Sequence, residues 1–137
     1  MPDTLQASEQ TLLEAYQEFK AQHPKTRIRE AARQLGVSEA ELLVTGVGQD
    51  TIRLEGEWDD MMKDFKTLGH VMSLTRNDAC VLEHMGTFEK VNTFGKGGHH
   101  MATVIGPIET RVFFKNWGFA FAHTMDQGNR VMHSIQI

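Results

Sequence analysis

The chain has 137 residues, which is enough for one domain with its own core and short for two. A single cysteine excludes a disulfide framework and any multi-cysteine zinc or iron–sulfur site. The net charge of −4 is unevenly distributed, because residues 1–68 carry 13 acidic and 8 basic side chains whereas residues 69–137 carry 5 and 6. No apolar run approaches the length of a membrane-spanning helix, so we expect a cytoplasmic protein without membrane insertion.

Helical periodicity dominates the first half of the sequence. Apolar residues recur at helical spacing, Gly36 and Gly69 follow two of the periodic segments, and Ser38 with Glu41 forms a capping box. The predicted helices cover residues 8–23, 26–35, 38–43 and 57–68, with a strand at 51–54.

After residue 69 the pattern changes to apolar–polar alternation with frequent glycines, which predicts antiparallel strands joined by short turns. The predicted strands cover residues 70–76, 79–85, 87–93, 101–105, 108–116, 118–125 and 131–137. The expected fold class is α+β, in a single domain of residues 1–137. A helical N-terminal layer at about 8–68 is followed by a curved antiparallel β-sheet at about 70–137.

Residues 29–43 have the spacing of a helix-turn-helix, with a glycine in the turn and a capped second helix. The end of that helix that would meet DNA carries Glu39 and Glu41, and no Lys or Arg lies between residues 34 and 51 to neutralise phosphates. A structural helical hairpin is therefore favoured. The alternative is a helix-turn-helix-like transcriptional or protein-interaction module.

Six of the seven histidines lie after residue 69, and two of them, His99 and His100, follow a glycine-rich segment at 94–98. Glycine permits a close approach of backbone to a ligand, and imidazole nitrogens bind metals. Adjacent residues on an extended segment point to opposite sides, so we expect at most one of the two to face a given ligand. The alternative is a flexible hairpin with incidental histidines.

The other histidines and the cysteine show weaker patterns. His84 has no metal-ligand spacing, whereas His123 and His133 could approach each other across the last hairpin; the alternative is that they face solvent. Cys80 lies among apolar residues, which predicts a buried, inert thiol.

Arg111 lies in the most aromatic segment of the chain, followed by Phe113 and Trp117. Aromatic faces beside a cation suit a flat apolar ligand that carries carboxylates. The alternative is that the aromatic residues belong to the core and that Arg111 lies at the rim of the sheet.

Several of these segments occur in one order in a known family. They are LGVSEAEL at 35–42, LTRN at 74–77, GTFE at 86–89, Arg111 with Phe113 and Asn116–Trp117, and HSIQ at 133–136. From about residue 10 onward the sequence resembles the HemS/ChuS-type haem-utilisation proteins, and the related ChuX/HutX proteins share their fold. HemS/ChuS-type proteins are tandem repeats of two halves, and this chain resembles one N-terminal half.

The resemblance implies a cytoplasmic haem-binding protein for haem uptake, haem trafficking and iron acquisition, which could contribute to haem degradation. Haem is the implied cofactor, and a haem importer or a reductase is an implied partner. Arg111 matches an arginine on the distal side of the haem, and His99 matches a histidine in a loop of the family. The axial histidine of the two-half proteins comes from their second half.

On this basis we expect haem contacts from Arg111, Phe113, Trp117, His99, His100 and His84. His99 is the first candidate for the iron ligand. We also expect a homodimer, because ChuX/HutX-type proteins pair as dimers and because the last strand, 131–137, is an alternating strand with a free edge.

Overall fold

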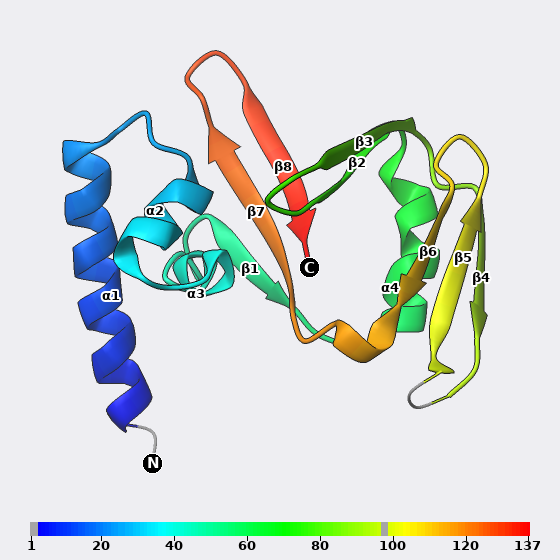
Figure 1. Cartoon of the computed structure of the whole chain (residues 1–137), viewed down its shortest axis with the longest axis horizontal. Helices are drawn as coiled ribbons and strands as arrows, with labels where there is room; N and C mark the ends of the chain where they lie inside the picture. Colours follow the sequence, from blue (N-terminus) through cyan, green and yellow to red (C-terminus); the bar gives the residue numbers. More distant parts are fainter. Residues whose placement is uncertain (1–2, 97–98) are drawn as a thin grey trace. The chain divides into compact units, whose positions relative to one another are not determined.

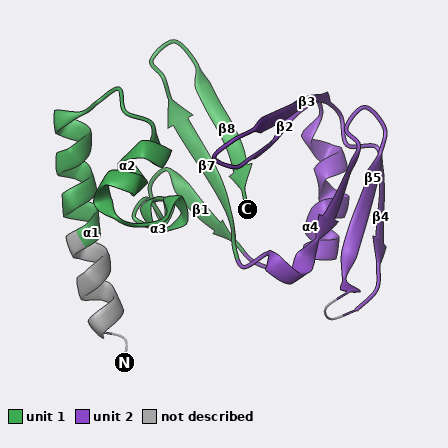
Figure 2. Cartoon of the chain, in the orientation of Figure 1, with its two compact units in different colours: residues 1–54, 119–137 green, residues 55–118 purple. Residues whose placement is uncertain are grey.

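The computed structural model describes residues 3–96 and 99–137 and confirms the α+β class (Figure 1). Gly97 and Gly98 of the glycine-rich segment lie outside these ranges. The chain forms two compact units, one of residues 1–54 and 119–137 and the other of residues 55–118 (Figure 2). Each unit contains both helices and strands, so the division between units does not follow the change from helices to strands near residue 69.

The first unit combines three helices with a three-stranded antiparallel sheet in the order β1-β7-β8. Its elements are α1 (Asp3–Gln22), α2 (Ile28–Leu35), α3 (Glu39–Val44), β1 (Thr51–Leu54), β7 (Ala120–Asp126) and β8 (Val131–Gln136). Ala31, Ala32 and Leu42 are buried, and Tyr16 and Phe19 of α1 pack against them. Within the described part of the chain, no helix is long and apolar enough to cross a membrane.

The segment with helix-turn-helix spacing is a packed helical hairpin. Gly36 ends α2 with a φ of 71°, and Ser38 begins α3 with a complete capping box. The Glu41 N–H donates to Ser38 Oγ at 3.2 Å, and the Ser38 N–H donates to the Glu41 carboxylate at 2.7 Å. The Ser38 N–H bond, together with a bond from the Ser38 hydroxyl at 2.9 Å, lowers the pKa of the Glu41 carboxyl, because both stabilise its charged form.

The second unit contains a two-stranded sheet, β2-β3, and a three-stranded sheet, β4-β5-β6, both antiparallel. Its elements are α4 (Trp58–Asp64), η1 (Phe65–Leu68), β2 (Val71–Arg76), β3 (Val81–Gly86), β4 (Lys90–Phe94), β5 (Met101–Ile105), β6 (Thr110–Phe113) and η3 (Phe114–Asn116). Met62 and Phe65 are buried, and α4 contacts β4. The ring of Phe65 lies 5.3 Å from that of Phe88, which fixes the segment leading into β4.

Cys80 corrects one prediction, because its side chain is exposed. The Asn77 side chain accepts the backbone N–H groups of Ala79 and Cys80 at 2.8 and 2.9 Å. These two residues therefore form the turn between β2 and β3, and β3 begins at Val81, two residues later than predicted. Local hydropathy suggested a buried thiol, but the turn places it at the tip of a hairpin.

Candidate functional site

The sheet β4-β5-β6 has one covered face and one open face. Val91, Ala102 and Val104 are buried and share one face, because Val91 pairs with Val104 in the register. Side chains alternate along each strand, so the neighbouring residues lie on the opposite face. That opposite face, which we call the open face, carries the residues considered next.

The open face carries three cross-strand rows of side chains; Lys90 and Ile105 form one of them, and the other two are described next. The first row is apolar and joins Phe94, Met101 and Phe113, which are paired across the three strands. The second row contains Thr103 and Arg111, which are paired in the register. Residues that lie directly opposite on neighbouring strands point to the same side of the sheet, so Arg111 lies beside the apolar row.

The apolar row is largely exposed to solvent. Phe113 keeps 60% of its surface exposed and Phe94 keeps 52%, whereas Met101 between them is half-buried. The prediction that the aromatic residues belong to the core therefore fails for Phe113. It holds for the next residue, Phe114, which is 4% exposed.

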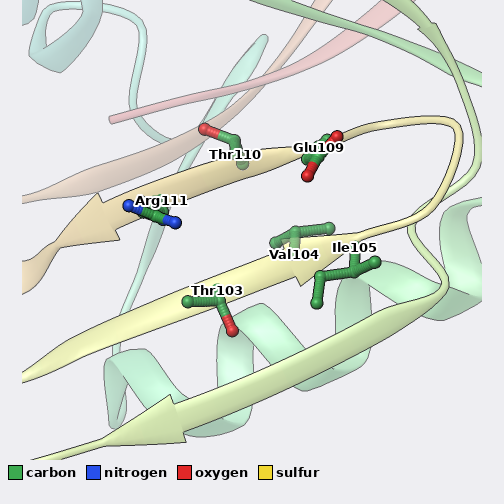
Figure 3. Close-up of a pocket in the computed structure, with 6 residues that line it drawn as sticks. All are labelled: Thr103, Val104, Ile105, Glu109, Thr110 and Arg111. Atoms are coloured by element: carbon green, nitrogen blue, oxygen red, sulfur yellow. The ribbon is translucent and has the colours of Figure 1, made fainter.

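An open pocket of about 350 Å³ lies beside Arg111 (Figure 3). Figure 3 shows Thr103, Ile105 and Arg111 on adjacent strands around it, with Glu109 and Thr110 completing the rim. The pocket is small for a ligand site, because such sites usually measure about 300–1,000 Å³. It is suited to one polar group of a ligand that lies across the open face.

His100 and Trp117 lie in a separate cluster within the second unit. His100 is hydrogen-bonded through Nε2 to the Asp59 carboxylate, and its ring lies 4.7 Å from the Phe114 ring. Trp117 lies 5.5 Å from Trp58, ring centroid to ring centroid. Both predicted haem contacts are therefore engaged with other side chains of the unit.

The two remaining predicted histidines are exposed. His99 precedes β5, and its backbone N–H donates to the Lys96 carbonyl at 3.3 Å. His84 lies on β3 opposite Ser73, in the two-stranded sheet and not in the sheet that carries Arg111. Within the described ranges, neither imidazole has a hydrogen-bond partner. Of the two, His99 is close in sequence to the open face, because it lies two residues before Met101.

His123 belongs to a polar network that the sequence did not indicate. Its Nδ1 lies 3.1 Å from Oγ1 of Thr51, which is 1% exposed and donates its hydroxyl proton to Asp50 at 3.0 Å. Since that proton is used, the hydroxyl oxygen is placed to accept a hydrogen bond from Nδ1 of the imidazole. Burial raises the pKa of the nearby Tyr16 hydroxyl, and the Asp50 carboxylate raises it further.

The final hairpin does not bring His123 and His133 together. The register pairs His123 with Ser134 and His133 with Thr124, so the two rings lie on opposite faces of the sheet. In residues 3–96 and 99–137, no three His, Cys, Asp or Glu side chains form a group that could hold a metal ion. An iron porphyrin brings its own nitrogen ligands, so a protein supplies at most one ligand on each side of the ring.

Comparison with known proteins identifies the family. Residues 36–137 match the model of the haemin-degrading HemS.ChuX domain. The chain belongs to this family. It is 33% identical to the hemin transport protein HmuS of Yersinia pestis over 128 residues, which is 92% of this chain and 36% of that protein.

Solved structures agree with this assignment. The heme-binding protein PhuS of Pseudomonas aeruginosa, in its holo form, matches 93% of this chain with 36% identity and a TM-score of 0.85. The heme degrading enzyme ChuS of Escherichia coli O157:H7 matches 88% of the chain with 26% identity and a TM-score of 0.74. The chain spans 36% to 37% of the length of these relatives, so it corresponds to one part of each.

Proposed function

We propose that this HemS/ChuX-family chain binds haem on the open face and serves haem uptake and trafficking for iron acquisition. The observation that carries the proposal is the apolar row of Phe94, Met101 and Phe113, whose two aromatic residues are exposed, beside the cation Arg111. A porphyrin is flat and apolar and carries two propionates. The apolar row would contact the ring, and the guanidinium of Arg111 would pair with a propionate.

His99 is the proposed iron ligand, because it is exposed and lies two residues before Met101 of the open face. Haem iron accepts a histidine nitrogen as an axial ligand, and His99 has no competing hydrogen bond to its imidazole among the described residues. His84 is the second candidate. It is also exposed but lies in the other sheet of the unit.

Haemin titration tests the proposal. We expect a Soret shift that saturates at a defined stoichiometry for the unaltered chain. We also expect the bands that report histidine ligation to be lost in His99→Ala and kept in His84→Ala. A spectrum that His99→Ala leaves unchanged would remove His99 as the ligand, and no saturable shift in the unaltered chain would refute haem binding itself.

The relatives include both transport proteins and a degrading enzyme, and we propose trafficking as the first role of this chain. The alternative is haem degradation, which requires an electron donor such as a reductase or ascorbate. Loss of the Soret band with release of iron on addition of ascorbate would favour degradation, whereas a stable spectrum would favour a carrier that receives haem from an importer in the cytoplasm.

We further propose a homodimer, for which β8 supplies a physical reason. It is the last strand in the order β1-β7-β8 and pairs only with β7 among the described residues, so one of its edges is open. Sedimentation over a range of concentrations, with and without haemin, tests this. A monomer at the highest concentration in both conditions would refute the dimer.

A further inference from the structure

Five side chains of the second unit form a closed series of contacts, which we call the anchor ring. His100 Nε2 is hydrogen-bonded to Asp59, and the His100 ring lies 4.7 Å from Phe114. Phe114 lies 5.0 Å from Trp117, and Trp117 lies 5.5 Å from Trp58, with all these rings edge to face. Because Trp58 and Asp59 are consecutive at the start of α4, the series closes on itself.

The anchor ring joins three parts of the chain: the start of α4, the segment before β5, and η3 after β6. A backbone bond reinforces it, since the Phe114 N–H donates to the His100 carbonyl at 3.0 Å. His100 and Phe114 are each preceded by an exposed residue, His99 and Phe113. His100 and Phe114 thus fix the backbone next to His99 and Phe113, two of the residues proposed to contact haem.

The structure gives His100 a different environment from that of His99. The Nε2 atom of His100 is hydrogen-bonded to Asp59, and its side chain is 22% exposed and lies against the Phe114 ring, whereas His99 is exposed. His100 therefore acts as an anchor for the segment before β5.

We infer that Asp59 is a positioning residue for haem binding, which acts through His100 to hold His99 and the end of β6 in place. This inference rests on the proposed function. Removing a hydrogen bond made directly to a metal-ligating side chain commonly changes metal affinity about 10- to 100-fold, and Asp59 bonds to the residue after the proposed ligand, so the lower end of this range applies. We therefore expect an effect of about tenfold on haemin affinity from a residue that has no contact with the haem.

The test compares haemin Kd and the visible spectrum of four variants with those of the unaltered chain. Asp59→Ala should raise Kd about tenfold and weaken the bands of histidine ligation. Asp59→Asn should bind like the unaltered chain, because its amide oxygen still accepts from Nε2. His100→Gln should keep the spectrum, since its amide still donates to Asp59. Asp60→Ala is the matched control, because Asp60 is an exposed acid in the same helical turn.

A double mutant separates positioning from a general loss of structure. In a His99→Ala background, Asp59→Ala should cause no further change in the spectrum, since the ligand it positions is absent. Near-ultraviolet circular dichroism of Trp58 and Trp117 reports whether the anchor ring persists.

Two results would overturn the inference: full affinity in Asp59→Ala, or loss of the ligation bands in His100→Gln. Loss of the ligation bands would make His100 itself the ligand. If the unaltered chain does not bind haemin, the proposed function fails instead, and the two failures are thereby distinguished.

Discussion

Phe113→Ala should weaken haem binding without weakening the fold. An aromatic side chain offers about 150–250 Å² in total. Since Phe113 keeps 60% of its surface exposed, about 90–150 Å² is available to a ligand. At about 25 cal/mol per Å², covering this whole area would contribute about 2–4 kcal/mol. A flat ligand covers one side of the ring, so we expect about 1–2 kcal/mol and a roughly tenfold rise in haemin Kd.

Two controls make this measurement decisive. Phe114→Ala removes a buried neighbour and should lower the free energy of unfolding by about 3–5 kcal/mol, whereas Phe113→Ala should change it by less than about 0.5 kcal/mol. Ile52→Ala removes an exposed apolar side chain from β1 and reports non-specific adsorption of haemin. Equal haemin affinity in the Phe113 variant and the unaltered chain would refute the open face as the binding surface, as would equal losses in the Phe113 and Ile52 variants.

Four further predictions concern stability and the loop before β5. Ser38→Ala should destabilise the protein by about 1 kcal/mol in a thermal melt at neutral pH. Because folding lowers the pKa of the Glu41 carboxyl, this group should stabilise the protein at pH values above its unfolded pKa near 4.5. The stabilisation should disappear as the pH falls through the folded pKa, which urea titrations at several pH values would show. The pKa of Tyr16 is raised, so stability should fall as the pH rises above 10.0 and through the folded pKa, and Tyr16→Phe should remove that dependence. Gly95→Ala should change the haemin spectrum in the same way as His99→Ala. Gly95 has a φ of +74°, and a Cβ at this position would clash with the His99 carbonyl oxygen.

Elements with strong local signals could be predicted from the sequence. The capping box at Ser38 and the glycine at position 36 have local physical causes, and both elements begin or end where these residues require. Boundaries set by tertiary contacts could not be predicted. The strand predicted through residue 116 ends at Phe113, because the Phe114 backbone bonds to His100 and its side chain turns inward.

The site was predictable in its residue types more than in its arrangement. Arg111 and Phe113 share a face because they are two residues apart on one strand, and this spacing is visible in the sequence. The environment of His100 was not visible, because its partner Asp59 lies 41 residues away and belongs to a helix. His123 was missed for the same reason, since its partner Thr51 is distant in sequence.

The extent of the open face argues for a second surface in the haem complex. The two rows that carry Phe113 and Arg111 lie on one side of three strands, and the pocket beside Arg111 measures about 350 Å³. A porphyrin laid on this face would keep its other side in water and would gain only part of the free energy that its apolar surface can supply. A surface from a second copy of the chain would cover the exposed side. Haem binding and self-association should then strengthen each other, because a ligand shared by two copies stabilises their association.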